Sequence, residues 1–264
     1  MSGRFAPSPH RGGRLLAALL LGGLITLPSC RSGTEGETET VTVYGAASLT
    51  GVLERIAASY EEETGADVRI KTGSSGALAK EIVSGAPADV FVSAHLDWVE
   101  TLREKGLIEA GAAKALAWNK LVVVVPAGAD SVPANWTEAM RLDRFVIADP
   151  QTSPAGKYAR DALLRMARWP AIEPRCVLSY DVRGALALVE RDEVAAGVVY
   201  LSDARASDRV KVAFRFPEGS YDPVVYVGAV LSGSERPEAA RRFLEYLNGP
   251  SGRSVFRELG FEGT

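Results

Sequence analysis

The sequence predicts an α/β fold with mainly parallel sheets, because two hydrophobic patterns alternate along its 264 residues. Short, nearly continuous apolar runs are typical of strands that are covered on both faces. Between them lie segments in which apolar residues recur at helical spacing. The composition, 47% hydrophobic and 24% charged, is that of a globular protein with enough chain for one or two cores.

Eight apolar runs are predicted as strands and six segments as helices. The strands span residues 41–44, 68–72, 89–92, 121–125, 145–148, 197–200, 210–216 and 224–231. The helices span residues 52–60, 77–84, 96–105, 155–167, 182–191 and 237–247. Gly65, Gly85 and Gly106 end the first three helical segments, as glycine commonly does. Pro237 begins the last at a first-turn position, where its missing N–H is not needed.

Two of the apolar strands are long enough to connect separate lobes. They lie in residues 118–126 and 222–231, and neither has an obvious helix between its halves. Strands of this length predict a two-lobe molecule in which the chain passes from lobe 1 to lobe 2 and back. A single large sheet is the alternative, and composition does not decide between the two.

The N-terminus is predicted to be a signal peptide over residues 1–29. Arg11 and Arg14 precede an apolar run from residue 15 to 27 that is too short for a stable transmembrane helix. The run ends Leu-Pro-Ser-Cys, which resembles a bacterial lipoprotein box and predicts lipidation of Cys30. An ordinary signal followed by a chance cysteine is the alternative.

Residues 30–40 are predicted to form a flexible tether, because the stretch after Cys30 is rich in Ser, Thr, Gly and Glu and has no apolar residue before Val41. Removal of the signal peptide removes Arg4, Arg11 and Arg14 and no acid, so the formal charge changes from −3 to −6. This acidic mature domain argues against nucleic acid or an anionic membrane as the partner.

Cysteine and histidine are too few for a disulfide framework or a zinc site. Only Cys176 remains besides Cys30, and a lipidated Cys30 cannot pair with it. We expect Cys176 to be a small buried hydrophobic residue. Of the two histidines, His10 leaves with the signal, and His95 next to Asp97 is expected to start a helix rather than bind a metal.

Two similar turns are the most informative feature of the chain. A strand runs into Gly-Ala-Ala-Ser-Leu-Thr at residues 45–50, and another runs into Gly-Ser-Ser-Gly at residues 73–76. Such turns direct backbone N–H groups and the hydroxyls of Ser48 and Ser75 to the start of a helix, where an anion is able to bind. Neither turn contains Lys or Arg. Plain N-caps are the alternative for each serine.

Three further elements offer donors of the same kind. Pro154 fixes a helix start at which Ala155 and Gly156 present unhindered N–H groups. Residues 179–182 form a fourth turn before a helix. Tyr200 ends an apolar run, where its phenol either donates into a crevice or belongs to the core. The acids Asp149 and Asp181, next to these turns, are expected to bind turn backbone.

The sequence offers little for catalysis. No Gly-x-Ser-x-Gly elbow accompanies a histidine able to act as base, and no phosphate-binding loop or dinucleotide fingerprint occurs. We therefore predict a protein that is not an enzyme and needs no cofactor. An exported enzyme on the same scaffold stays as an alternative that requires an acid/base pair facing the cleft.

Four segments closely resemble the molybdate/tungstate-binding proteins of ABC importers, and the resemblance extends over residues 41–262. The segments are Ala-Ala-Ser-Leu-Thr at 46–50, Gly-Ala-Pro-Ala-Asp-Val-Phe-Val-Ser-Ala at 85–94, the turn from 149 to 159, and the stretch from Asp181-Val-Arg to Ser-Asp-Ala at 202–204. The resemblance implies a type II periplasmic-binding-protein fold with two crossover hinge strands. It implies lobe 1 at residues 41–120 plus 225–264 and lobe 2 at residues 121–224.

The resemblance also implies a binding site made of neutral donors. Matched motif by motif, the donors fall on Ser48, Ser75, Ala155, Val182 and Tyr200. Where family members often have a further small polar residue, this chain has Gly76, so that Ser74 stays open as the second serine. The implied partners are the molybdate or tungstate oxyanion and an ABC permease with its cytoplasmic ATPase, and one-to-one capture needs only a monomer.

Oxyanion chemistry agrees with such a site. Molybdate is a fully deprotonated dianion at neutral pH and accepts hydrogen bonds only, whereas phosphate carries a proton for which a site gains from a buried acceptor. Sulfate, thiosulfate or a small organic anion are the alternative solutes. Arg183 or Lys157 in the cleft would favour a carboxylate, but both side chains are expected to point along helix surfaces. A sensor or adhesion protein without a permease is a further alternative, at the same exported, periplasmic or outer-face location.

Overall fold

The structure is a computed structural model in which residues 39–263 are described. The predicted signal peptide, the predicted lipidation site Cys30 and the predicted tether up to residue 38 lie outside the described residues. Thr40, which the sequence places in the tether, is instead the first residue of strand β1 and pairs with Asp67. The described residues belong to one compact unit. Two five-stranded sheets organise it, and each sheet with its helices is called a lobe below.

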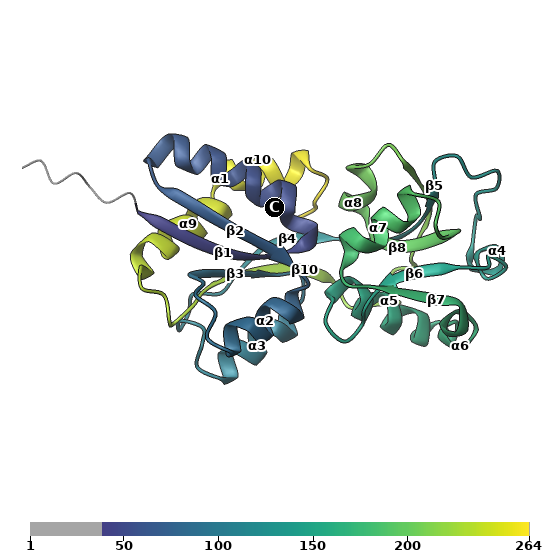
Figure 1. The fold of residues 1–264 in the computed structure, drawn as a ribbon, viewed down its shortest axis with the longest axis horizontal. Coiled ribbons are helices and arrows are strands. Elements are labelled where there is room, and N and C mark those ends of the chain that lie inside the picture. The colour runs from purple at the N-terminus through teal and green to yellow at the C-terminus, as the bar shows by residue number, and fades with distance from the viewer. Residues whose placement is uncertain (1–38, 264) are drawn as a thin grey trace, which may run out of the picture. The chain divides into compact units, whose positions relative to one another are not determined.

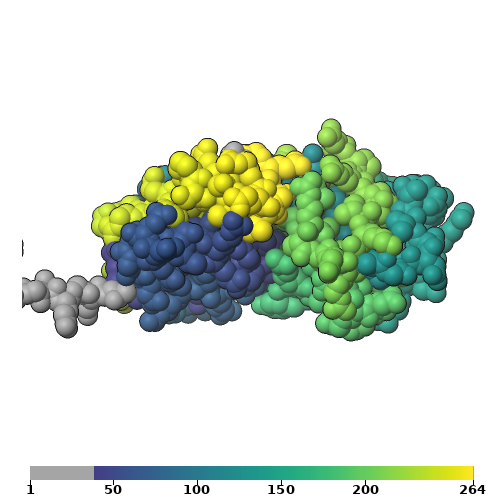
Figure 2. Space-filling view, turned by 90° about the horizontal axis from the view of Figure 1, so that it is seen from above, coloured from purple at the N-terminus to yellow at the C-terminus, as the bar shows by residue number. Residues whose placement is uncertain are grey.

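The sheet of lobe 1 has the strand order β2-β1-β3-β10-β4 (Figure 1). Its strands are β1 (Thr40–Ala46), β2 (Asp67–Gly73), β3 (Val90–Ser93), β4 (Lys114–Asn119) and β10 (Val224–Val230). Helices α2 (Ser75–Val83) and α3 (Leu96–Glu104) cover one face. Helices α1 (Thr50–Thr64), α9 (Pro237–Asn248) and α10 (Pro250–Glu258) cover the other. The last two helices, yellow in Figure 2, therefore pack on segments from the start of the domain.

The sheet of lobe 2 repeats the same plan with the strand order β7-β6-β8-β5-β9. Its strands are β5 (Leu121–Pro126), β6 (Phe145–Ala148), β7 (Cys176–Ser179), β8 (Ala196–Tyr200) and β9 (Val210–Arg215). Helices α5 (Pro154–Arg165) and α6 (Trp169–Ile172) lie on one face, and α7 (Val182–Glu190) and α8 (Leu201–Arg205) on the other (Figure 1). The short helix α4 (Trp136–Ala139) and the turns η1 (Ala47–Leu49) and η2 (Glu173–Arg175) complete the elements.

Each sheet is mixed, with one strand reversed. In lobe 1, β10 pairs antiparallel with both β3 and β4, and in lobe 2, β5 pairs antiparallel with both β8 and β9. The other four strands of each sheet run in one direction. The expectation of mainly parallel sheets therefore holds for strand direction, while the pairings divide equally between the two kinds.

The two passages of the chain between the lobes differ from the expected continuous strands. The first is a direct step from β4 to β5, in which only Lys120 separates Asn119 in one sheet from Leu121 in the other. The second is the loop between β9 and β10, because β10 belongs wholly to lobe 1 from Val224 onward. The fully buried β5 follows Trp118 after only two polar residues, which hides the break from a hydropathy pattern.

Several short elements were missed in the sequence. Strand β4 is missed because its pattern of alanines and exposed positions is weakly apolar, and β7 because it is a half-buried edge strand. Cys176 begins β7 and is half-buried rather than fully buried, and burial raises the pKa of its thiol to about 11. Helix α10 is missed because Asn248-Gly249-Pro250 ends one helix and also starts the next, with Pro250 at its first turn.

The described helices are those of a protein core. None of the helices within residues 39–263 is long and apolar enough to span a membrane.

Parallel strands in both sheets end at the facing edges of the two lobes, and ligands of open α/β sheets bind at such carboxyl ends. The turns singled out in the sequence follow these strand ends.

Candidate functional site

All five predicted donors and Ser74 line one small cavity between the lobes. Lobe 1 contributes the turns after β1 and β2, and lobe 2 contributes the starts of α5 and α7 and the end of β8. The cavity volume is about 10 Å³, which is room for the centre of roughly one water molecule. The full lining is Ala46, Ala47, Ser48, Gly73, Ser74, Ser75, Ala94, Ser153, Pro154, Ala155, Asp181, Val182 and Tyr200. Within the described part of the chain, this lining has no Lys or Arg.

Neither of the two lobe 1 serines caps a helix. Ser48 lies inside the turn η1, and the residue before α1 is Leu49. Ser75 is the first residue of α2, and the preceding Ser74 makes no side-chain capping bond either. The alternative of plain N-caps is therefore wrong for this pair. Both hydroxyls are buried at the cavity wall, with exposed fractions of 4% for Ser48 and 0% for Ser75.

The hydroxyl of Ser75 is arranged as a donor. Its Oγ accepts a hydrogen bond from the backbone N–H of Ala94 at 3.2 Å. This bond uses a lone pair of the oxygen, so the hydroxyl hydrogen stays free for the cavity. Ser74 differs, because its Oγ donates across to the carbonyl of Thr152 in lobe 2. The hydrogen of Ser74 therefore serves contact between the lobes, and Ser75 is the serine with a hydrogen to offer.

Two helix N-termini of lobe 2 supply backbone donors. Ala155 follows Pro154 at the start of α5, and Val182 is the first residue of α7. The first N–H groups of a helix have no acceptor within it and carry the positive end of its dipole. Gly156 lets α5 approach β6 closely, because an added Cβ would lie 2.0 Å from the carbonyl oxygen of Ala148.

The two acids next to these helices bind turn backbone, as expected. The carboxylate of Asp149 accepts from the N–H of Gln151 at 2.8 Å, and that of Asp181 accepts from the N–H of Gly184 at 2.9 Å. Asp181 lines the cavity, but one of its carboxylate oxygens is engaged as the N-cap of α7. These acids hold the donor turns in shape.

Tyr200 has a hydroxyl group for which the described protein supplies no partner. The residue is 1% exposed, lines the cavity, and its hydroxyl lacks any hydrogen-bond partner within the described residues. Burial raises the pKa of this phenol well above its usual value, so it stays protonated. A buried hydroxyl without a partner is unfavourable by about 1–3 kcal/mol, and native proteins keep such groups mainly at functional sites.

Arg183 connects the lobes instead of lying along a helix surface, which corrects the sequence-based expectation. Its Nε donates to the carbonyl of Ala47 in lobe 1 at 3.4 Å and lies 3.5 Å from Oδ1 of Asp203 in lobe 2. The side chain of Asp203 is fully buried, and burial raises the pKa of its carboxyl to about 7 against the opposing effect of Arg183. Arg183 therefore faces a carboxyl group and a carbonyl, outside the cavity lining.

Lys157 and His95 also take part in contacts between the lobes, and the His95 ring lies 4.6 Å from that of Tyr158 between centroids. Lys157 forms an exposed ion pair with Asp97 at 3.2 Å, again in contrast to the expected position along a helix. Such exposed pairs contribute about 0–1 kcal/mol. His95 starts α3 as expected, and its Nδ1 accepts from the N–H of Asp97 at 3.1 Å. Burial lowers the pKa of its imidazole, which agrees with a neutral ring that accepts this bond.

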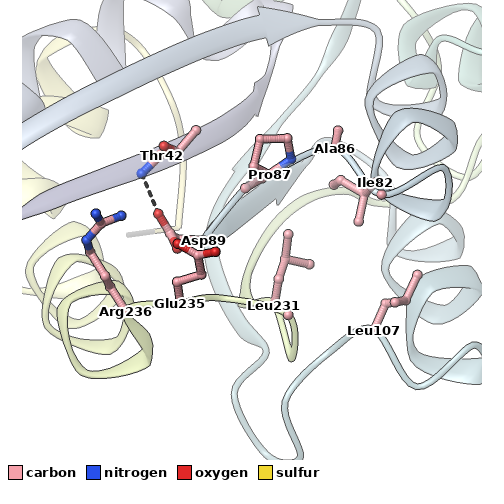
Figure 3. Close-up of a pocket in the computed structure, with 12 residues that line it drawn as sticks. Thr42, Ile82, Ala86, Pro87, Asp89, Leu107, Leu231, Glu235 and Arg236 are labelled. Atoms are coloured by element: carbon pink, nitrogen blue, oxygen red, sulfur yellow. Dashed lines mark hydrogen bonds between the residues drawn. The ribbon is translucent and has the colours of Figure 1, made fainter.

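A larger pocket in lobe 1 is lined by two carboxylates, Asp89 and Glu235, and by Arg236. It has a volume of about 360 Å³ and lies at the amino end of β3, away from the facing lobe edges (Figure 3). Its buried carboxylate, Asp89, accepts from the N–H of Thr42 at 2.7 Å and from the hydroxyl of Ser234 at 2.6 Å. These bonds tie β1 to the loop after β10, which indicates a structural role.

Three residues next to the cavity were missed in the sequence. Tyr226 lies within a strand and Asn119 at the end of one, and the hydropathy pattern includes each in a mainly apolar run. Asp203 lies in the Ser-Asp-Ala segment already noted at 202–204. The one signal for Asn119 and Tyr226 is a polar group inside a buried strand, which requires a partner that only the fold reveals.

Comparison with known proteins assigns the family. Residues 41–262 match the model of the family described as bacterial extracellular solute-binding protein. The chain belongs to this family. It is therefore a solute-binding protein, not an enzyme, and the family description places its members outside the cell.

Three proteins similar to this chain share the description of a molybdate-binding protein. The molybdate-binding protein ModA of Escherichia coli is 41% identical over 228 residues, covering 84% of this chain and 88% of that protein. ModA of Haemophilus influenzae is 38% identical, covering 84% and 89%. The solved periplasmic molybdate-binding protein of Azotobacter vinelandii superposes with a TM-score of 0.75 at 25% identity, covering 85% of this chain and 99% of that one. This likeness confirms the two-lobe fold expected from the sequence.

The buried carboxyl of Asp203 predicts an unusual dependence of stability on pH. Its pKa of about 7 in the folded protein is above the ordinary value of 3.8, so the folded state holds the proton at a pH where the unfolded chain has lost it. The contribution of this group is fully present below pH of about 4 and is lost as the pH rises towards about 7. Asp203→Asn should remove this loss, which is a few kcal/mol at most.

Urea unfolding of the two proteins from acidic to slightly basic pH tests this prediction. The difference in unfolding free energy between Asp203→Asn and the unaltered protein should move in favour of the variant as the pH rises. Asp222→Asn, at an exposed carboxyl, is the control. A difference that does not change with pH would show that Asp203 does not titrate in this range.

Proposed function

We propose that the protein binds molybdate, and also tungstate, in the cavity between its lobes and delivers it to an ABC permease. The donors are the hydroxyls of Ser48, Ser75 and Tyr200 and the backbone N–H groups of Ala155 and Val182. The observation that carries the proposal is the fully buried hydroxyl of Tyr200, which lines the cavity without a partner. A tetrahedral oxyanion would supply its missing acceptor, and the molybdate-binding relatives support this choice of ligand.

The donor set suits a dianion without a proton. Hydroxyls and helix N-termini donate to oxygen, and hydrogen bonds to a charged acceptor contribute about 1.5–3 kcal/mol each. Several such bonds are needed, because desolvation of an ion in a buried site is unfavourable by several kcal/mol or more. The charge of Arg183 is directed at Asp203 and Ala47, so binding rests on dipoles and hydrogen bonds.

Protonation and size distinguish the candidate solutes. Phosphate carries a proton near neutral pH, so its P–OH group would face a hydrogen-bond donor where it needs an acceptor. Sulfate has the charge of molybdate but a smaller tetrahedron, so a closed donor set spaced for molybdate fits it less well. Sulfate or thiosulfate is the second candidate, because the same donors would satisfy its charge as well.

Movement of the lobes is part of the proposal. The cavity is about the size of one water molecule, so a four-oxygen ion enters only when the lobes separate and sets their spacing when they close. The hinges of this movement would be the two segments that connect the lobes, at Lys120 and in the loop from 216 to 223. We propose the same lobes as from the sequence, except that Val224 belongs to lobe 1.

The remaining parts of the proposal concern location and partners. The signal peptide of residues 1–29 would direct export and then be removed, and a lipid on Cys30 would hold the mature protein at the outer face of the membrane, with the tether spanning the distance to the permease. A monomer suffices, since both lobes of the binding site come from one chain. The permease would work with a cytoplasmic ATPase.

Isothermal titration with molybdate, tungstate, sulfate and phosphate tests the solute. We expect molybdate and tungstate to bind tightly with one ion per chain, sulfate to bind much more weakly, and phosphate to give no heat. Binding of sulfate or phosphate alone would contradict the proposal.

Removal of the Tyr200 hydroxyl should weaken molybdate binding without lowering the stability of the protein. We expect Tyr200→Phe to weaken molybdate binding by about 10- to 100-fold, because one charge-assisted hydrogen bond is lost. Without added oxyanion, the variant should melt at the same or a higher temperature, because the hydroxyl has no partner in the protein. The control is Tyr246→Phe, because the Tyr246 hydroxyl donates to Glu63 at the surface. Unchanged molybdate affinity would exclude Tyr200 as a ligand.

Gly76 should be required for closure of the lobes. Its N–H donates to the carbonyl of Thr152 across the cleft at 2.8 Å, and an added Cβ would lie 2.5 Å from that oxygen. The same Cβ would lie 2.5 Å from the ring of Trp98. We expect Gly76→Ala to weaken molybdate binding about ten-fold or more, because the lobes are held apart.

Titration calorimetry measures the effect on affinity, and small-angle scattering with molybdate present should show a larger radius of gyration for Gly76→Ala. The matched control is Gly51→Ala on α1, where an added Cβ meets no atom within 4 Å. Unaltered affinity and size in Gly76→Ala would show that closure does not depend on this contact.

A further inference from the structure

A chain of buried hydrogen bonds leads from the passage between the lobes to the cavity. Asn119 Nδ2 lies 3.2 Å from the hydroxyl of Tyr226, and that hydroxyl lies 3.0 Å from Oγ of Ser48. All three residues are buried, with exposed fractions of 6%, 0% and 4%. Of the three, only Ser48 lines the cavity. We refer to Asn119, Tyr226 and Ser48 as the relay.

The direction of the first bond follows from the amide of Asn119. Its Oδ1 accepts from the backbone N–H of Lys120 at 2.9 Å and from that of Ser202 at 3.5 Å. Because N–H groups only donate, these contacts place the oxygen on this side and the NH₂ group on the other. Nδ2 then donates to Oγ of Ser202 at 2.8 Å and to the hydroxyl of Tyr226.

The direction of the second bond follows from the first. The hydroxyl of Tyr226 accepts from Asn119, and Ser48 Oγ at 3.0 Å is the one acceptor that the described residues offer to its hydrogen, so we assign Tyr226 as the donor to Ser48. Burial raises the pKa of Tyr226 well above its usual value, which keeps that hydrogen on the phenol. Ser48 accepts it with a lone pair and has its own hydrogen left for the cavity.

We infer that Tyr226 and Asn119 are positioning residues that fix the hydroxyl of Ser48 as a donor to the bound oxyanion. This inference rests on the proposed function. Without the relay, the Ser48 hydroxyl is free to rotate and to accept a hydrogen bond as readily as to donate one. With the relay in place, the Ser48 hydroxyl points its hydrogen into the cavity. An OH group of a protonated oxyanion would then face this hydrogen and find no acceptor there. The relay thus selects against protonated oxyanions through residues that do not touch the ligand.

The relay also contacts lobe 2 through Asn119. Asn119 ends β4 next to the first passage of the chain, and its NH₂ group binds Tyr226 of lobe 1 and Ser202 of lobe 2 together. Ser202 lies on α8, two residues after the proposed ligand Tyr200. A change in lobe angle would therefore alter the bonds of Asn119, and closure and the orientation of the Ser48 hydroxyl are coupled.

A double-mutant cycle measured by titration calorimetry with molybdate tests the inference. Tyr226→Phe keeps the ring and removes the relay hydroxyl, and we expect it to weaken binding about ten-fold. In a Ser48→Ala background, the same change should cost little further affinity, because Tyr226 acts only through the Ser48 hydroxyl. In a Ser75→Ala background, its effect should persist in full, because Ser75 takes its support from Ala94 instead.

A structural effect of Tyr226→Phe would be the same in all three backgrounds, so the cycle separates positioning from general damage. Equal losses in every background, or unchanged affinity in Tyr226→Phe, would overturn the inference alone. Failure of the unaltered protein to bind molybdate would overturn the proposed function and this inference with it. Asn119→Asp gives a second measure, because a carboxylate accepts the Tyr226 hydrogen and draws the Ser48 hydrogen away from the cavity. It should weaken binding more than Tyr226→Phe does.

Discussion

A buried anion has to be surrounded by donors on nearly every side, and this constraint explains the arrangement of both lobes. No single strand or helix supplies enough donors, so four turns and the end of strand β8 converge on one cavity. Each sheet places its parallel strand ends at the facing edge, and the helices that follow present their first N–H groups there. The repeated strand order in the two lobes is the architecture that brings these ends face to face.

The groups around the cavity are arranged so that their hydrogens stay available. Ser75 accepts from a backbone N–H and Ser48 contacts a phenol, so each oxygen has a protein partner for a lone pair. The acids nearby bind turn backbone or, like Asp203, are buried beside an arginine. The guanidinium of Arg183 is engaged by Asp203 and the carbonyl of Ala47 and is not part of the cavity lining. The result is a neutral wall of donors, which suits a ligand that only accepts hydrogen bonds.

Much of this could be predicted from the sequence because it resides in local patterns. Apolar runs show the strands, and small hydroxyl residues after a strand show a turn that leads into a helix. What could not be predicted depends on contacts between distant residues. The partner of Ser74 lies 78 residues away and that of Ser48 lies 178 residues away. Only the assembled lobes distinguish Ser74 from Ser75, show Arg183 as a bridge, or reveal Tyr226 behind Ser48.

The central claim is that a dianion is held between the lobes by neutral donors. A crystal structure of the protein with molybdate, with anomalous data at the molybdenum edge, tests it most directly. The account predicts one anomalous peak between Ser48, Ser75 and Tyr200, with the oxygens bound by hydroxyls and by the N–H groups of Ala155 and Val182. A peak elsewhere, or molybdate oxygens bound by Arg183 or Lys157, would contradict it.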